Sequence, residues 1–207
     1  MSLMIKLRQF QSEDLNALYA ISLATGHEGG DASHLYRDAK LMGHIYSAPY
    51  ALLEPDLVLV VIDGDGVAGF ATGAIDTLSW EDVLERNWWP TLRCDYPDPE
   101  VASSATWTAD QRRAFTIHHP ERTPRTVADA YPAHLHLNLL SRVQGQGIGL
   151  NLLKAWLDLA AKRGAAAVHV GVNRANQRAL RFWSQNSFKD LKLEGRVGGR
   201  TIWMGRS

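Results

Sequence analysis

A glycine-rich segment, Arg142-Val-Gln-Gly-Gln-Gly-Ile-Gly149, lies between a stretch of alternating apolar and polar residues and a longer stretch with helical spacing. Closely spaced glycines let a backbone turn several N–H groups toward one point, and the N-terminus of the following helix adds partial positive charge. The segment therefore predicts a site for a phosphate or pyrophosphate group that needs no lysine. The alternative is a tight strand-to-helix turn that binds nothing.

Two common phosphate-binding motifs do not fit this segment. A Walker A loop ends in Gly-Lys-Ser/Thr, whereas here the chain reads Ile148-Gly149-Leu150. A dinucleotide-binding G-x-G-x-x-G fingerprint places its third glycine one residue later than Gly149, and it belongs to the first strand-to-helix turn of a domain. This loop comes late in the chain, after several elements that favour antiparallel pairing.

Side chains that could move a proton lie just before the loop. His134, His136 and Asn138 alternate along a predicted strand, so they share one face, and histidine is a natural general base near neutral pH. The alternative is that these are half-buried strand histidines bonded to their neighbours. Asp76, at the end of an earlier strand, is a second candidate base, or else it caps a turn. His169 on a later strand is open to the same two interpretations.

The residues that could bind a metal do not have the spacing that is typical of a metal site. His134 and His136, with His118 and His119, would be a start for zinc, but no cysteine or carboxylate completes a spaced set. The single cysteine, Cys94, excludes an internal disulfide framework and a CxxC site. We expect no metal.

The elements that must position these residues are regular at both ends of the chain. Alternation predicts a strand over 133–140, helical spacing predicts a helix over 148–163, and a further strand and helix follow over 167–172 and 176–185. Earlier, two apolar stretches flank the turn Asp63-Gly-Asp-Gly66, which is typical of a β-hairpin.

The middle of the chain, residues 78–132, holds four tryptophans and six of the eight prolines. An insert of this length inside a compact domain is usually functional or partly helical, and 81–86 and 109–118 could be short helices. Its aromatic side chains either pin the insert to the core or form a lid over a substrate pocket.

Two motifs resemble the signatures of the GNAT superfamily of N-acetyltransferases. Gln144-Gly-Gln-Gly-Ile-Gly149 matches its Q/R-x-x-G-x-G/A pattern, and Asn176-Gln-Arg-Ala-Leu-Arg-Phe-Trp183 resembles its Asn-x-x-Ala signature with an aromatic pair. Other segments are similar to the bacterial acetyltransferases related to the C-terminal domain of human O-GlcNAcase; these segments are 25–31, 43–50, 67–76 and 134–137.

The resemblance covers nearly the whole chain and implies a single α/β (α+β) domain over residues 4–207. Its central sheet would be mixed but mostly antiparallel, with helices on both faces, the 78–132 insert over the acceptor side and an acetyl-CoA-binding core over 133–188. The resemblance further implies a cofactor-binding set made of Leu137, Leu139, Gln144, Gly145, Gln146, Gly147, Ile148, Gly149, Asn176 and Phe182. In this set, the backbone of the strand would pair with the pantetheine arm and the loop amides would hold the pyrophosphate.

The resemblance implies acetyl transfer from the CoA thioester directly to an amine. The catalytic candidates for this reaction are His136, Asp76 and Asn138. Related domains would carry a carboxylate where Asn138 stands, and an amide cannot take a proton. Many family members have a tyrosine where Trp183 stands, and an indole does not give up its proton near neutral pH. These two departures motivate the alternative of a catalytically weak or inactive module that binds acetyl-CoA or a peptide.

Composition limits the partners. Lys plus Arg and Asp plus Glu are both 22, which argues against a protein that grips nucleic acid or anionic membrane by bulk charge. With 45% hydrophobic residues the chain can bury a core, yet no apolar run is long enough to span a bilayer. We expect a cytoplasmic monomer or homodimer that acts on a small amine or a peptide.

Overall fold

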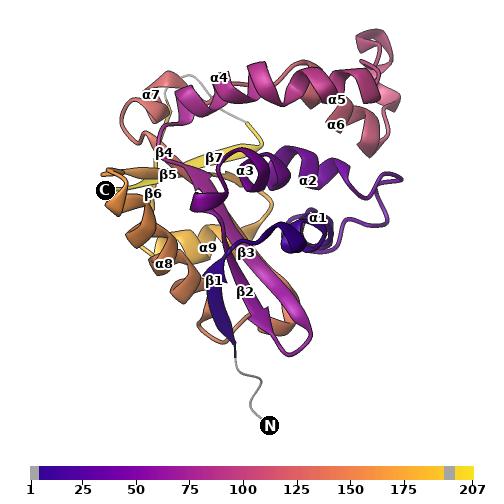
Figure 1. Ribbon diagram of the computed structural model, residues 1–207. Coiled ribbons are helices and arrows are strands. Elements are labelled where there is room, and N and C mark those ends of the chain that lie inside the picture. The colour runs from indigo at the N-terminus through magenta and orange to yellow at the C-terminus, as the bar shows by residue number, and fades with distance from the viewer. Residues whose placement is uncertain (1–4, 194–198) are drawn as a thin grey trace.

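The computed structural model describes residues 5–193 and 199–207 (Figure 1). Its strands form one seven-stranded sheet in the order β1-β2-β3-β4-β5-β7-β6. Every neighbouring pair is antiparallel except β4 and β5, which are parallel, so the predicted mixed, mostly antiparallel sheet is confirmed. The strands are β1 (Lys6–Gln9), β2 (Leu59–Asp63), β3 (Gly66–Ala74), β4 (Ala133–Leu139), β5 (Val168–Asn173), β6 (Lys189–Asp190) and β7 (Thr201–Arg206).

The sheet splits between β4 and β5. These two strands pair only at Ala133–Val168 and His134–His169, whereas β4 stays in register with β3 as far as Leu139. One edge of β4 therefore loses its strand partner beyond His134. Backbone N–H and C=O groups on such an edge are available to a ligand or to water.

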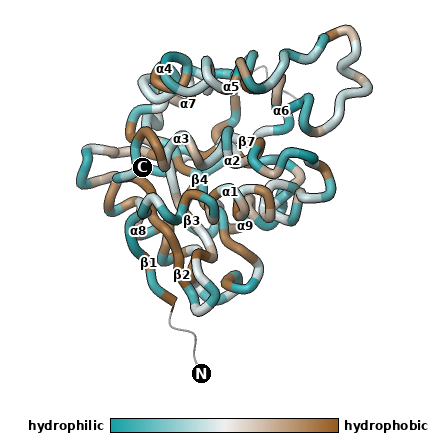
Figure 2. Tube along the Cα trace, turned by 45° about the vertical axis from the view of Figure 1, so that its right-hand side comes forward, coloured by the Kyte–Doolittle hydropathy of each residue, from teal (hydrophilic) through white to brown (hydrophobic). Residues whose placement is uncertain are grey.

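Helices cover both faces of the sheet. Figure 1 shows α8 (Ile148–Lys162) on one side of β1–β3 and α1 (Leu15–Ala24) on the other. The helix α9 (Gln177–Gln185) joins the core on the α8 side, while α2 (Leu41–Tyr46) and α3 (Ala48–Leu53) join that on the α1 side. The strand β2, hydrophobic along much of its length in Figure 2, supplies side chains to both cores.

The side chains of β4 alternate between these two layers. Leu135, Leu137 and Leu139 pack into the core under α8, so the histidines and asparagine between them face α1–α3.

The insert is a layer of helices. It contains α4 (Thr77–Asn87), α5 (Trp89–Asp95), α6 (Ala109–His118) and α7 (Arg125–Ala128), and in Figure 1 it lies at the top, beside α2 and α3. Trp80 and Trp89 are buried in the same core as α1–α3. The aromatic side chains of α4 and α5 thus attach the insert to the domain.

Polar caps mark where several helices begin. Asp76 caps α4, Thr108 forms a capping box with Gln111 at α6, and Asn176 caps α9. Short 3-10 turns connect other elements; they are η1 (Ser12–Asp14), η2 (Pro55–Leu57), η3 (Val101–Thr106) and η4 (Ser141–Val143). In the part of the chain that the structure describes, no helix has the length and apolar character needed to cross a membrane.

At Gly73, β4 and α8 both lie close to the backbone of β3. A Cβ atom at this position would lie 1.9 Å from the carbonyl oxygen of His134 and 2.7 Å from the ring of Trp156. Gly73→Ala should therefore lower the free energy of unfolding by about 3 kcal/mol or more, because backbone atoms must move. Urea denaturation measures this change.

Gly199→Ala is the matched control, since a Cβ there meets nothing nearer than the carbonyl oxygen of Thr201 at 4.0 Å. Equal stability of the two variants would contradict the packing described for Gly73.

Candidate active site

The glycine loop runs from η4 to the first residue of α8. Gly145 and Gly147 have φ angles of 74° and 76°, in the left-handed region that favours glycine. A Cβ at either position would meet no atom within 4 Å, so backbone conformation, and not lack of space, requires glycine here.

This loop presents a row of unused donors. Within the described residues, the backbone N–H groups of 145–150 donate to no protein acceptor, and the first N–H that does so belongs to Asn151, which bonds the carbonyl of Gly147. These groups lie at the positive end of a fifteen-residue helix. The arrangement fits an anion of the size of a phosphate or pyrophosphate.

Two glutamines brace the loop. Gln144 donates from Nε2 to the carbonyl of Leu139 at 2.6 Å, and its Oε1 accepts from Arg178. Gln146 donates to the carbonyl of Arg142 at 3.0 Å. Both side chains hold the loop in shape, a role that motif matching alone did not assign to them.

Gly149 has a packing role. A Cβ on it would lie 3.3 Å from the ring of Phe182 and 3.4 Å from the side chain of Leu139. The start of α8 can therefore approach both β4 and α9. The structure brings together these three members of the predicted cofactor-binding set, and the neighbouring Ile148 packs against the same core.

A cleft of about 160 Å³ lies on the α1–α2 side of β4, where the sheet splits. Its lining residues come from α1 and the loop after it, from α2, β4 and β5, and from the cap of α9. They are Ser22, Thr25, Gly26, Glu28, Gly29, Met42, Tyr46, His136, Asn138, Asn173 and Asn176. Three residues predicted from the sequence, His136, Asn138 and Asn176, thus meet in one cleft.

Asp76 has a different position. It is exposed, its Oδ1 accepts from the backbone N–H of Ser79 at 2.9 Å, and it is not among the residues lining the cleft. The structure therefore places it as the cap of α4, which was the second interpretation of this residue.

Asn138 is tied to the end of α1. Its Nδ2 donates to Thr25 Oγ1 at 2.6 Å, and Thr25 Oγ1 in turn donates to the carbonyl of Ile21 at 2.7 Å. Because the hydroxyl proton of Thr25 is already used, the partner of this oxygen must be a donor. An amide supplies one, whereas a carboxylate does not.

The histidines lie in a network that sequence reasoning did not find. Tyr50 Oη is 2.7 Å from Nε2 of His134 and 3.3 Å from Nε2 of His136. Thr77 Oγ1 is 2.8 Å from Nδ1 of His134, and Nδ1 of His169 is 2.6 Å from the carbonyl oxygen of Tyr131.

Burial keeps these imidazoles neutral. It lowers the pKa of His136 to about 4, lowers the pKa of His134 well below its ordinary value, and lowers the pKa of His169 as well. Neighbouring imidazoles add to this effect, since His136 and His169 oppose charge on His134, and His169 opposes charge on His136. At neutral pH the cleft therefore presents an uncharged imidazole with a basic lone pair.

Sequence reasoning also missed Tyr46, whose ring packs edge-on against His136 with the ring centres 5.9 Å apart. Tyr46 and Tyr50 both lie in the 43–50 segment that contributes to the resemblance. The resemblance assigned no chemical role to either tyrosine. Trp183 is buried between Phe182 and Phe188 and forms part of the core.

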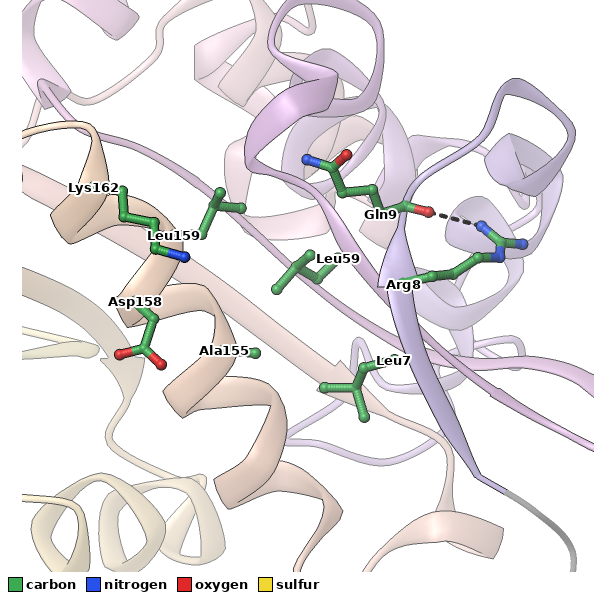
Figure 3. A pocket seen from close by; sticks show the side chains of 8 residues that line it. All are labelled: Leu7, Arg8, Gln9, Leu59, Ala155, Asp158, Leu159 and Lys162. Atoms are coloured by element: carbon green, nitrogen blue, oxygen red, sulfur yellow. Dashed lines mark hydrogen bonds between the residues drawn. The ribbon is translucent and has the colours of Figure 1, made fainter.

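A larger hollow of about 330 Å³ lies elsewhere, between β1 and the second half of α8 (Figure 3). Leu7, Leu59 and Lys162 are among its lining residues, and none of the predicted site residues is. Volume alone would therefore have selected this hollow as the functional site and not the cleft that His136 lines.

Comparison with known proteins identifies the class. The sequence model described as the acetyltransferase (GNAT) family matches residues 15–188, so the chain belongs to this family. A solved protein named SsHAT is 32% identical, with a TM-score of 0.87 and coverage of 98% of this chain and 97% of that one.

Two other relatives are more distant. Rat protein O-GlcNAcase is 22% identical over 158 residues, which are 75% of this chain but only 16% of the rat protein. The protein yncA from Salmonella typhimurium, solved with acetyl-CoA as its cofactor, is 15% identical, with a TM-score of 0.55 and coverage of 98% of this chain and 93% of that one. This last likeness shows the fold alone.

The buried neutral histidines make stability depend on pH. In the unfolded chain these imidazoles take up protons near pH 6.5, whereas in the folded chain they do not. The free energy of unfolding should therefore fall as the pH drops below about 6.5, and His136 alone accounts for on the order of 3 kcal/mol by pH 4.

Urea denaturation between pH 7.5 and 4.5 measures this slope, and His136→Gln should reduce it. A free energy of unfolding that stayed constant over this interval would contradict the burial of neutral imidazoles.

Proposed function

We propose that the protein is an acetyl-CoA-dependent N-acetyltransferase that transfers the acetyl group directly to the amine of a small molecule or peptide. The observation that carries this proposal is the position of two features at the split of the sheet. The unused N–H row of 145–150 lies at one end of β4, and a cleft with a neutral histidine lies on its α1–α2 face. Family membership supports the assignment.

The chain's residues fit the cofactor. The N–H groups of 145–149 would hold the pyrophosphate, and the free edge of β4 at Leu137 and Leu139 would pair with the pantetheine arm. Asn176 and Phe182 would lie beside that arm, as the cap of α9 and the ring under Gly149. Acetyl-CoA supplies the thioester carbonyl that the amine attacks.

His136 acts as the general base. Its neutral imidazole takes a proton from the attacking amine, an N–C bond forms and the C–S bond breaks. The reaction releases and consumes no net proton, because the amine loses one proton and the coenzyme A thiolate gains one. A low pKa keeps His136 in its basic form at physiological pH and favours release of the proton after each turnover.

A second candidate is a module that binds acetyl-CoA without appreciable turnover. Burial of Trp183 in the core removes a hydroxyl from the position where many relatives have a tyrosine, and Asn138 is committed to Thr25. In this alternative the cleft would recognise an acetylated or amine-bearing partner and leave it unchanged.

Binding tests the cofactor assignment. Titration calorimetry should detect acetyl-CoA at micromolar concentration, with CoA bound as well and NAD not bound. Gly147→Ala should weaken the affinity about tenfold or more, because an L residue resists the left-handed φ of 76° that aims the N–H groups. Undiminished affinity in this variant would separate the loop from the binding site, and absence of acetyl-CoA binding to the parent protein would sink the assignment.

Turnover tests the base. In an assay of coenzyme A release with a panel of amines and amine-bearing peptides, His136→Gln should lower kcat by about 100-fold while the Kd for acetyl-CoA stays within about twofold.

Asp76→Asn retains a capping side chain and should keep full turnover. A loss confined to Asp76→Asn would assign the base to Asp76 instead. Binding without turnover of any amine would favour the second candidate.

A further inference from the structure

A chain of hydrogen bonds leads from the backbone at the end of the insert to the cleft. It begins at the carbonyl oxygen of Pro132, which lies 2.7 Å from Thr77 Oγ1. It continues through Thr77, His134 and Tyr50 and ends at His136, with contacts of 2.8, 2.7 and 3.3 Å. These residues come from the start of α4, from β4 and from α3.

The carbonyl oxygen of Pro132 determines which group donates in every hydrogen bond of this chain. A carbonyl oxygen only accepts, so Thr77 spends its single proton on Pro132. The Nδ1 atom of His134 must then donate to Thr77 Oγ1, because two acceptors at 2.8 Å would repel each other. A neutral imidazole that is protonated on Nδ1 is an acceptor at Nε2.

The same pairing of one donor with one acceptor determines the hydrogen bonds nearer the cleft. Tyr50 donates its proton to Nε2 of His134 at 2.7 Å, which leaves only lone pairs on Tyr50 Oη. The Nε2 atom of His136, 3.3 Å away, must therefore donate. His136 is left with an unprotonated Nδ1, which has no protein partner among the described residues, and its ring lines the cleft.

We infer that Thr77, His134 and Tyr50 are positioning residues that fix His136 as the Nε2–H tautomer, with Nδ1 as the basic atom offered to the acceptor amine. The inference rests on the proposed function and names the atom through which His136 acts. Without this chain of hydrogen bonds, either nitrogen of His136 could carry the single proton and the ring could turn.

Packing holds the chain in place. Tyr50 is buried, its ring stacks on Trp80 with the ring centres 4.5 Å apart, and burial raises the pKa of its hydroxyl, which therefore keeps its proton. His134 is only 8% exposed. Water therefore has little access to replace a member of the chain.

Nitrogen-15 NMR of the intact protein with labelled histidine reads each tautomer directly, with no ligand and no turnover. We expect His136 to show a protonated Nε2 and an unprotonated Nδ1, and His134 to show the opposite pattern. His134→Gln and His136→Gln assign the signals. A protonated Nδ1 on His136 would overturn the inference.

Thr77→Val tests the direction of the chain, because valine keeps the shape of threonine and removes the hydroxyl. Without an acceptor at Nδ1, His134 should move its proton to Nε2, Tyr50 should then donate to His136, and His136 should become protonated on Nδ1. We expect kcat to fall at least tenfold with the Kd for acetyl-CoA unchanged. Thr77→Ser, which restores the hydroxyl, should recover both the tautomer and the rate.

Thr72→Val is the matched control. Thr72 pairs with His136 across β3 and β4, and its buried hydroxyl has no hydrogen-bond partner among residues 5–193 and 199–207. It therefore lies next to the hydrogen-bond chain without belonging to it. This variant should keep the parent tautomers and rate. A Thr77→Val protein with unchanged tautomers, or a Thr72→Val protein with the same reversal, would overturn the inference.

The two proposals fail separately. If the parent protein turns over no amine, the proposed function falls, while the NMR signals still decide the proton arrangement. If the protein is active but His136 carries its proton on Nδ1, the positioning inference falls and the acetyltransferase assignment stands.

Discussion

Strands β4 and β5 hydrogen-bond at Ala133–Val168 and His134–His169 and then separate. The last pair brings two imidazoles together with ring centres 5.8 Å apart, and both are buried, so two charges there would repel at low dielectric. Burial lowers the pKa of both imidazoles and keeps them neutral, and an oxygen partner, Thr77 for His134 and the carbonyl of Tyr131 for His169, fixes which nitrogen carries the proton. The point where the sheet splits is therefore also the point where histidine protonation is most restricted.

The insert is fastened to the domain at this same point. Pro132, its last residue, accepts from both the backbone N–H and the hydroxyl of Thr77, where α4 begins, at 2.8 and 2.7 Å. With its two ends joined, a long insert adds a helical layer without disturbing the register of β3 and β4. The ring of Trp80 in that layer then stacks on Tyr50. No residue of 78–132 is among those that line the cleft. The insert therefore supports the site indirectly, through contacts such as that of Trp80 with Tyr50.

The sequence predicted the features that depend on local spacing. Glycines at 145 and 147 have positive φ, alternation places His136 and Asn138 on one face of β4, and Asn176 caps α9. The sequence did not predict Tyr50 or Thr25 as partners of that face, because they are 86 and 113 residues away from the residues they contact. For the insert it predicted helices over 81–86 and 109–118. The second matches α6, whereas α4 extends beyond the first at both ends and α5 was not predicted. Their tryptophans and Pro90 obscured a helical pattern that packing stabilises.

Two departures from the family pattern have different physical consequences. At position 138 the surroundings are adapted to the amide, since Thr25 has already given its proton to Ile21 and needs a donor. Position 183 is occupied by a core side chain packed between two phenylalanine rings, so no dissociable proton is available there. Under the proposed function, the proton acceptor in this cleft would then be another side chain on the same face of β4. His136, two residues before Asn138, has the required lone pair, and its environment keeps that lone pair free at neutral pH.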